Sequence, residues 1–574
     1  DILDVDAVAQ RQSNLISIAG AASSSGAAAI SIGVALYGQG DATADDGTDA
    51  DAEYDASREA SNSIMAEDTA SYNSHLSSDD IAAIEADSGS SIARNSGIPA
   101  TATTTESGNS LSIDGESVTA ARISGGTIDV NTLNVDAKTL QHSYQGLGAA
   151  QISSYGIAGV IGITRSYEMA IATVDSEVNA NEVSINGSIE NVSDEDGALE
   201  MKSAVIGLGG TSVVVNYTDA RSENRVLAGI NSAVGDDSGN ISVTATDSTE
   251  IRLGDTDSGT PSSATDGALN VNIGAAAIGV SVGYASKDSD IDAWIGEAGK
   301  LVDGYQNISL SALNEGLVKS TAFALSGGLL AGIQGVVTMA YDDSNANATM
   351  SGTIGTGSGI VNIDAQSAPE LYASSYGVTL AGGAAMGASF AYAITDTKAK
   401  AEISDGTIFT GSGDVVMRSE TGKGEDGYET AHAAAFAASG GLLAGLAGTE
   451  ARATNNAQSI AKVGDGVYIP DANFEVYARN TGVQVADADG YFVGLVAGGY
   501  QTGLAKSFTT TRVEIGKDPI ATLERSGELV FDAASVNNNQ SFTTAGGGGY
   551  YSGSAAESIV EAGDYSDGKY SAAV

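Results

Sequence analysis

Hydrophobic and polar residues alternate along most of this chain with a period of two. This is the pattern of β-strands, in which successive side chains point to opposite faces. Short alternating segments such as Leu133–Ala137 and Val361–Ala365 are bounded by Gly, Asn and Asp, which favour turns. A period of 3.6 is rare outside residues 41–107. The pattern therefore predicts an all-β fold for nearly the whole chain.

Three landmarks recur in one order about every fifty-five residues. The first is a glycine pair inside an apolar segment, with spacings of 55, 58 and 58 positions between Gly327-Gly328, Gly382-Gly383, Gly440-Gly441 and Gly498-Gly499. The second is a short alternating strand ending in a small residue, with copies that start at Leu133, Val183, Ile241, Ile308, Val361, Val415, Phe474 and Leu529. The third is an Ile or Val followed by a turn, in segments that start at Ala293, Ala401, Ala461 and Val513. Landmarks in constant phase predict repeats that stack on one another.

Stacking places equivalent residues about 4.8 Å apart, so that Val, Ile and Leu fill the interior while Gly and Ala let two sheets approach. We therefore predict a parallel β-solenoid, resembling a right-handed β-helix, formed by residues 1–40 and 108–574. Residues 41–107 match no repeat and carry Ala, Glu, Met and Ile at helix-like spacing, which predicts an acidic, partly helical insertion. The uncharged segments Ser320–Tyr341 and Leu371–Thr395 are long enough to span a membrane, but their Gly, Ser and Thr residues favour buried sheet.

The amino-acid composition limits the classes of partner that the chain can bind. Asp and Glu number 73 against 25 Lys and Arg, a formal net charge of −48, which excludes nucleic acid and argues against an anionic membrane surface. The chain has no cysteine, which excludes disulfides, thiolate metal sites and a cysteine nucleophile. It starts at Asp1 without Met or an apolar leader, which we expect of a processed or excerpted piece of a longer protein.

The order of the landmarks resembles the repeats of giant bacterial filamentous adhesins, the leukotoxin-type and filamentous-haemagglutinin-like surface proteins. In that order a glycine pair, an apolar Ala/Gly segment and a polar alternating strand precede a turn such as Ala461–Gly466 and a strand such as Val361–Ala365. The resemblance is clearest over residues 275–549, looser over 121–274 and absent over 41–107. It implies secretion to the cell surface, a right-handed parallel β-helix and a role in adhesion or fibre formation, and it implies no site residue.

Candidate chemistry is sparse. His75, His142 and His432 are far apart and lack metal-ligand spacing, and the chain contains neither a nucleophile elbow nor a P-loop. No cofactor is required. Calcium is the one candidate ion, because closely spaced carboxylates in turns suit a hard cation, although ordinary turns explain them equally well. The candidate calcium ligands are Asp194, Asp196, Asp236, Asp237, Asp487 and Asp489.

We expect a non-enzymatic structural segment of an extracellular fibre or giant adhesin at the bacterial cell surface, giving a stiff rod for reach, attachment or matrix. The expected partners are further repeats of the same chain or identical subunits stacked end to end, without nucleic acid or a membrane span. One alternative is a glycan- or host-surface-binding module that uses the 41–107 insertion and the tyrosine-rich loops. A polysaccharide lyase or hydrolase built on a β-helix is less favoured.

Overall fold

The computed structural model describes residues 2–37, 117–193, 197–235, 239–254, 268–296, 301–356, 359–423, 428–469, 472–516, 528–563 and 572–573. The chain divides into two compact units, one formed by Asp1–Tyr37 with Val118–Val574 and the other by Gly38–Ser117. The predicted insertion, residues 41–107, lies outside the described residues. Within the described ranges the protein is all-β, and no helix there is long and apolar enough to cross a membrane.

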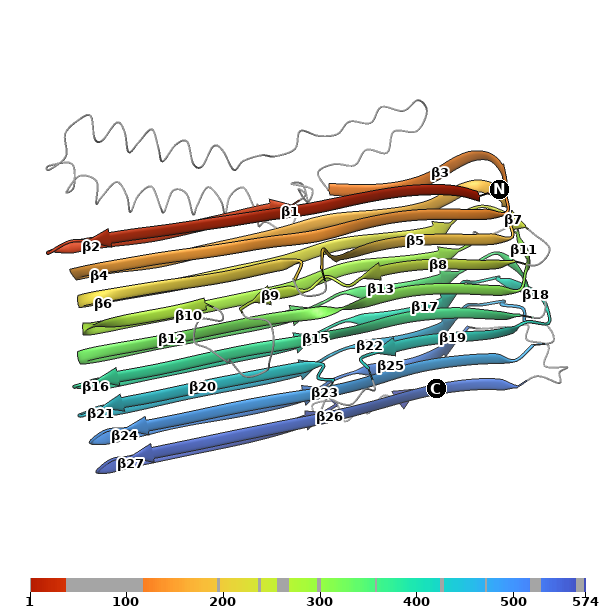
Figure 1. Cartoon of the computed structure of the whole chain (residues 1–574). Helices are drawn as coiled ribbons and strands as arrows, with labels where there is room; N and C mark the ends of the chain where they lie inside the picture. Colours follow the sequence, from red (N-terminus) through yellow and green to blue (C-terminus); the bar gives the residue numbers. More distant parts are fainter. Residues whose placement is uncertain are drawn as a thin grey trace, which may run out of the picture. The chain divides into compact units, whose positions relative to one another are not determined.

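The strands follow one another in chain order (Figure 1). The first half contains β1 (Ile2–Ala22), β2 (Gly26–Tyr37), β3 (Ser117–Asp129), β4 (Thr132–Asn179), β5 (Glu182–Asn191), β6 (Leu199–Ile230), β7 (Val234–Gly235), β8 (Asn240–Asp247), β9 (Ile251–Leu253), β10 (Ala268–Ile295), β11 (Leu301–Tyr305), β12 (Asn307–Asp342), β13 (Asn345–Met350) and β14 (Thr353–Thr356). The second half contains β15 (Ile360–Ala381), β16 (Ala384–Thr395), β17 (Lys398–Ile403), β18 (Ile408–Gly411), β19 (Asp414–Thr421), β20 (Ala431–Gly441), β21 (Ala444–Asn455), β22 (Gln458–Val463), β23 (Phe474–Val493), β24 (Val496–Ser507), β25 (Thr510–Ile515), β26 (Leu529–Gly548), β27 (Tyr551–Ala562) and β28 (Ala572–Ala573).

Strands of consecutive repeats pair in parallel and in register, as Figure 1 shows for the long strands from the red N-terminal to the blue C-terminal repeats. The predicted register of the second landmark is confirmed, because the first residue of each copy pairs with the first residue of the copy in the next repeat. Leu3 starts one further copy that the sequence pattern did not reveal. The resulting column runs through Leu3, Leu133, Val183, Ile241, Ile308, Val361, Val415, Phe474 and Leu529.

The third landmark is also confirmed in register. Ala293 pairs with Ala348, and the column continues through Ala401, Ala461 and Val513. Gly406 and Gly466, which end the turns after this landmark, have φ angles of +70° and +68°. Residues with side chains rarely adopt this left-handed conformation, which explains the Asp-Gly sequence at both turns.

The glycine pairs mark a common bend but do not share a register. In the paired strands Gly327 lies opposite Leu380, Gly440 opposite Val493, and Gly498 opposite Leu446. Each pair lies at the bend between an outgoing and a returning segment or a few residues from it. The prediction of a common phase is therefore right for the bend and wrong for the residue-by-residue pairing.

The interior is layered along the strands. One apolar cluster contains the inward residues of the second and third landmarks, and another lies nearer the bend, formed largely by alanines with some larger aliphatic residues. Between the two clusters the inward positions are polar, as at Asn314 and Asp342 in β12, which are fully buried. The sequence pattern predicts apolar interior columns and does not reveal this polar layer.

Candidate interaction surface and buried polar centre

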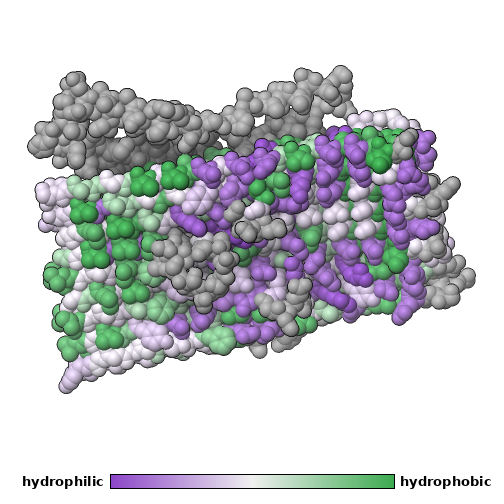
Figure 2. Space-filling model, viewed as in Figure 1, coloured by the Kyte–Doolittle hydropathy of each residue, from purple (hydrophilic) through white to green (hydrophobic). Residues whose placement is uncertain are grey.

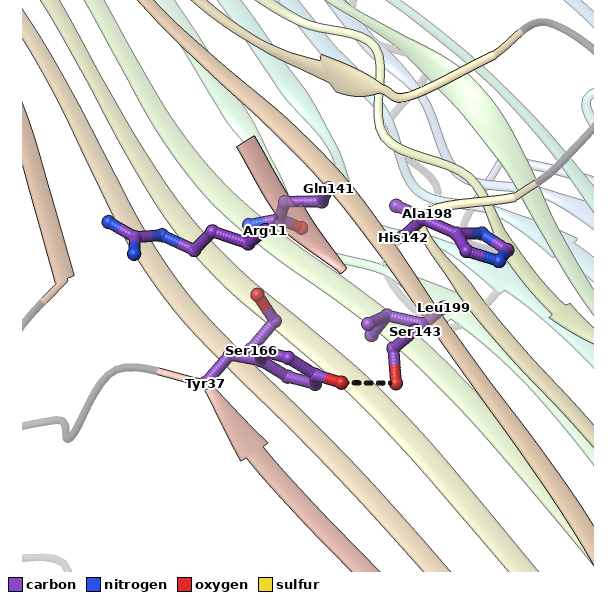
Figure 3. Close-up of a pocket in the computed structure, with 8 residues that line it drawn as sticks. All are labelled: Arg11, Tyr37, Gln141, His142, Ser143, Ser166, Ala198 and Leu199. Atoms are coloured by element: carbon purple, nitrogen blue, oxygen red, sulfur yellow. Dashed lines mark hydrogen bonds between the residues drawn. The ribbon is translucent and has the colours of Figure 1, made fainter. Parts of the chain in front are cut away.

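His142 and Ser143 are neighbours in the sequence, and the fold separates their side chains. They are consecutive residues of β4 and therefore point to opposite faces of the strand. The Nδ1 atom of His142 lies 3.1 Å from the carbonyl oxygen of Gly197, while the hydroxyl of Tyr37 donates to Ser143 Oγ at 2.8 Å (Figure 3). The two side chains therefore do not form a serine–histidine pair.

His432 lies on the outer face beside carboxylates. Its Nδ1 atom is 2.6 Å from a carboxylate oxygen of Glu429, and its ring packs on Tyr372 with centroids 5.7 Å apart. Partial burial raises the pKa of Asp487 and the nearby Asp489 raises it further, while His432 acts in the opposite direction. This arrangement is a small polar cluster on the strand surface.

The calcium candidates fall into two groups. Asp487 and Asp489 are outward residues within the long strand β23, so the prediction that they lie in a turn is wrong. The Asp-Ala-Asp-Gly sequence suggested a turn, but in-register pairing of β23 with β20 and β26 keeps it extended. Among the described residues no group of three or more His, Asp or Glu side chains is placed to hold a metal ion. His75 and the candidates Asp194, Asp196, Asp236 and Asp237 lie outside the described residues.

A column of carboxylates runs along the outer face, at Glu223, Asp288, Asp343 and Asp396. Asp288 pairs with Glu223, and backbone hydrogen bonds from the amides of Asp343 and Asp396 to the preceding repeats continue the register. Partial burial, Asp343 and Glu223 together raise the pKa of Asp288 to about 7. Burial also raises the pKa values of Asp343 and Asp396. The stacked negative charges therefore oppose ionisation.

We expect the stability of the protein to increase as the pH is lowered from about 8 to about 5. A carboxyl group whose pKa is raised by folding binds more protons in the folded than in the unfolded state, so stability is lost as the pH rises through the folded pKa. Thermal unfolding should therefore give its highest melting temperature near pH 5.

The variant Asp288→Asn tests the origin of this effect. It should raise the melting temperature at pH 8 and flatten the dependence between pH 6 and pH 8. Asp532→Asn, which removes one charge away from the column in β26, should leave the slope as it is. Equal slopes for all three proteins would assign the pH dependence to overall charge instead of to the column.

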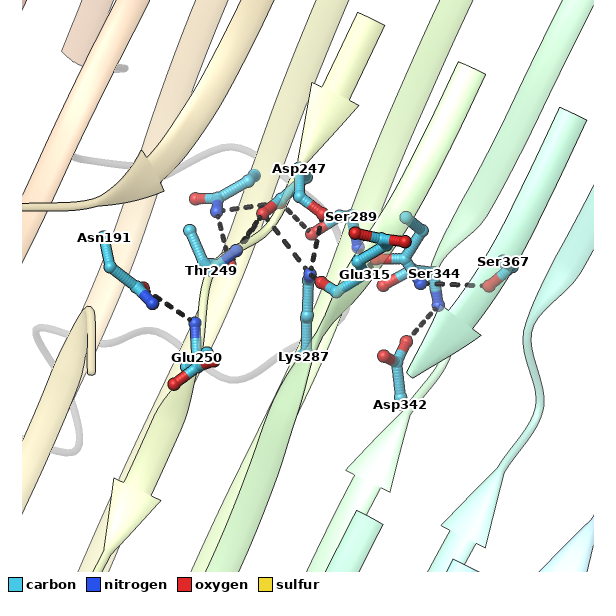
Figure 4. Close-up of polar contacts among 12 residues, drawn as sticks. Asn191, Asp247, Thr249, Glu250, Lys287, Ser289, Glu315, Asp342, Ser344 and Ser367 are labelled. Carbon is cyan, nitrogen blue, oxygen red and sulfur yellow. Dashed lines mark hydrogen bonds and ion pairs between the residues drawn. The ribbon is translucent and has the colours of Figure 1, made fainter. Parts of the chain in front are cut away.

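A fully buried lysine forms the centre of the polar layer. Lys287 in β10 lies 3.3 Å from a carboxylate oxygen of Asp247, and both side chains are 0% exposed. Its Nζ atom also donates to the carbonyl oxygen of Glu315 at 2.6 Å (Figure 4). The buried ammonium group is therefore both neutralised and hydrogen-bonded, as a charge in a protein interior requires.

The two carboxylates of this centre have different environments. Asp247 accepts hydrogen bonds from Ser289 at 2.6 Å and from the Thr249 hydroxyl at 2.7 Å. Burial opposes its ionisation, but Lys287 and these donors lower the pKa of Asp247 below its usual value. For Asp342, which accepts from the Ser344 amide at 2.8 Å, burial dominates and raises the pKa to about 6. The centre thus holds one cation against two carboxylates.

The end of the repeats that contains the bend has an apolar exterior, shown in green and white in Figure 2. Leu329 and Leu442 at the bend are 72% and 77% exposed, and Leu380 before the bend is 57% exposed. No charged residue occurs in the segments that form this end. We call these segments the apolar end: residues 19–33, 149–162, 205–217, 270–283, 324–338, 377–391, 437–449, 490–503 and 545–556.

Inward positions at the apolar end are partly polar, and they alternate with buried apolar residues such as Val336 and Phe492. The side-chain amide of Asn272 donates to the carbonyl oxygen of Ile278 at 2.7 Å, and that of Asn270 donates to Val280 at 2.8 Å. Both asparagines are fully buried and connect the outgoing and returning segments of one repeat. In this repeat the polarity near the bend is the reverse of that in an ordinary soluble protein, with amides inside and aliphatic side chains outside.

This reversal corrects one prediction. Ser320–Tyr341 and Leu371–Thr395 do form sheet, but their large apolar side chains near the bend face outwards. The alternating sequence Leu269–Ile273 contains the signal, because its two asparagines and three aliphatic residues occupy opposite faces. Exposed apolar areas beyond a few hundred Å² mark sites of interaction, so the apolar end is the candidate functional surface.

The chain was compared with family models, with curated proteins and with solved structures, and none of them matches it.

Proposed function

We propose that the chain is a β-solenoid segment of an extracellular bacterial surface fibre or giant adhesin, in which it acts as a stiff rod. The observation that supports this proposal most strongly is the in-register column from Leu3 to Leu529, which joins the same strand of every repeat. A stack of this kind gains stability from contacts between neighbouring repeats and can be lengthened by adding further ones. Reach and stiffness follow from that arrangement.

The proposed role is non-catalytic. In its support, the outward carboxyl groups of Asp288, Asp343 and Asp396, whose pKa values are raised, form a column across successive strands instead of converging in a cleft. The net charge of −48 suits a surface that must stay dispersed in water and stay clear of anionic lipids and nucleic acid. The same proposal includes an extracellular location, a role in adhesion and end-to-end continuation of the stack by identical repeats.

Immunogold electron microscopy of the producing cells tests the proposal. Antibodies raised against the 574-residue chain should label filaments on intact, unpermeabilised cells, and diffraction from the aligned filaments should show the spacing of about 4.8 Å between stacked repeats along the filament axis. Pre-absorption of the antibodies with the purified chain provides the control and should abolish labelling.

Labelling confined to permeabilised cells would contradict the extracellular role. Filaments that lack the spacing of about 4.8 Å along their axis would contradict the stacked architecture. The two readings are independent, so location and architecture are tested separately.

A further inference from the structure

The outer surface of the apolar end is corrugated. In one outward column large residues alternate with glycine over the last six repeats, and the full column is Ala22, Ile152, Leu208, Ile273, Gly327, Leu380, Gly440, Val493 and Gly548. With neighbouring repeats about 4.8 Å apart, equivalent large residues recur about every 10 Å. We call this line of residues the ridge column.

From the repeat with Gly327 to the repeat with Gly440 the bend alternates in the opposite phase. The repeat with Gly327 in the ridge column has Leu329 and Leu330 at the bend, whereas the repeat with Leu380 has Gly382 and Gly383 there. Leu442 and Leu443 follow Gly440 in the same way. Knobs and hollows therefore form a checkerboard over these three repeats, and the hollows join into a shallow apolar groove of about 630 Å³. The checkerboard ends at the repeat with Val493, where the bend residue Leu495 is 50% exposed.

The backbone at the bend leaves little for a polar partner to bind. The amide of Gly382 donates to the carbonyl oxygen of Gly328 at 2.9 Å, and that of Leu443 donates to Gly383 at 2.9 Å. With these groups paired between repeats, the surface offers shape and apolar area. A partner must therefore be apolar and must carry knobs at the same spacing as the hollows.

A second copy of this chain meets that requirement. Its bend leucines Leu329 and Leu442 are two repeats apart, which is also the spacing of Gly327 and Gly440 in the ridge column. The charge distribution points the same way. Two copies of the chain, each with a net charge of −48, repel each other over most of their surfaces. The apolar end is a continuous face on which the two copies can meet without opposing carboxylates.

The available area suffices for a stable dimer. Nine repeats at about 4.8 Å give a length of about 40 Å, and six residues of strand before the bend give a width of about 20 Å. The resulting area of about 800 Å² on each copy equals that of a typical specific interface.

We propose that two copies of the chain pair laterally through their apolar ends, with the leucine knobs of one copy seated in the glycine hollows of the other. This pairing goes beyond the proposed rod, which requires contacts only between successive repeats. It joins rods side by side and leaves their open strand edges free for continuation.

Analytical ultracentrifugation of the full chain at micromolar concentrations tests the pairing. The unaltered chain should sediment as a dimer, and the double variant Leu329→Glu/Leu442→Glu should weaken dimerisation by at least ~100-fold, because it places carboxylates at the centre of the interface. Both leucines are exposed, so the fold should be retained, which circular dichroism checks. Ile360→Glu, at an exposed position in β15 far along the strand from the bend, provides the matched control and should dimerise normally.

Cross-linking gives a second reading. The chain has no cysteine, so Leu329→Cys introduces a single thiol. A flexible bis-maleimide, which can span the interface between the two thiols, should give a covalent dimer with Leu329→Cys and much less with Ile360→Cys.

Four results would overturn the pairing. Three of them are an unaltered chain that stays monomeric, equal cross-linking of the two cysteine variants, and association that the leucine variants leave unchanged. The last result would indicate end-to-end stacking and would leave the proposed rod intact. Flotation of a monomeric chain with phosphatidylcholine vesicles, abolished by the leucine variants, would also overturn it by assigning the apolar end to lipid.

Discussion

The variant Lys287→Met is expected to lower the free energy of unfolding by about 3–5 kcal/mol, the usual effect of removing one partner of a buried ion pair. Met has nearly the length of Lys, so the loss reflects charge and hydrogen bonding more than volume. Asp247 would remain fully buried next to Asp342 without a cation between them. Urea unfolding followed by circular dichroism, together with hydrogen exchange over β8 to β12, measures the loss and its location.

A compensating variant separates electrostatics from packing. Lys287→Met combined with Asp247→Asn and Asp342→Asn removes all three charges and should recover a large part of the stability. The single variant should also be less damaging at pH 5 than at pH 8, because the pKa of Asp342 is already raised to about 6 and its carboxyl group readily takes up a proton. A triple variant that is no more stable than Lys287→Met would refute the charge explanation.

Ala365→Leu is expected to destabilise the centre of the stack by about 3 kcal/mol, the upper part of the usual range for overpacking. Ala365 is in the column of small residues that ends the second landmark, between Ala312 and Ser419. In that column Ser419 Oγ lies 2.8 Å from the carbonyl oxygen of Ala399, and a Cβ atom at Gly187 would lie 3.0 Å from that of Leu227. The facing backbone therefore leaves room for little more than one or two side-chain atoms.

Two matched variants control this prediction. Ala365→Ser should be nearly neutral, because serine already occupies the same column at Ser419. Gln366→Leu adds apolar bulk at the adjacent, half-exposed outward position and should also be tolerated. Limited proteolysis and hydrogen exchange over β15 to β19 should show opening with Ala365→Leu alone. Equal protection in all three variants would mean that the two layers can separate at this column.

The register of the stack could be predicted because the second landmark combines large inward residues with a small one at a fixed offset. A shift by one residue would turn Leu133 and Val135 outwards and break their columns with Val183 and Ile185. The glycine pairs predicted only where the bend lies. Glycine can occupy positions before or after a bend, so it does not fix which residues pair between repeats.

The inside and outside of the apolar end could not be predicted from alternation alone. A strand such as Leu269–Ile273 offers an aliphatic face and an amide face, and the general preference for apolar interiors selects the wrong one here. The amide face is inside because Asn270 and Asn272 reach carbonyl groups of the returning segment, a contact that no local pattern encodes. Lys287 was missed for the same reason, since its partner Asp247 is forty residues away in sequence.

The parallel register has a mechanical consequence. Each repeat stores about fifty-five residues in a step of about 4.8 Å, whereas the same residues span about 190 Å when fully extended. Since each repeat is bonded only to its neighbours, load on one end can peel off a single repeat and release roughly forty times its folded thickness as slack. A tether made of such repeats therefore lengthens in discrete steps under tension, one step for each repeat that detaches.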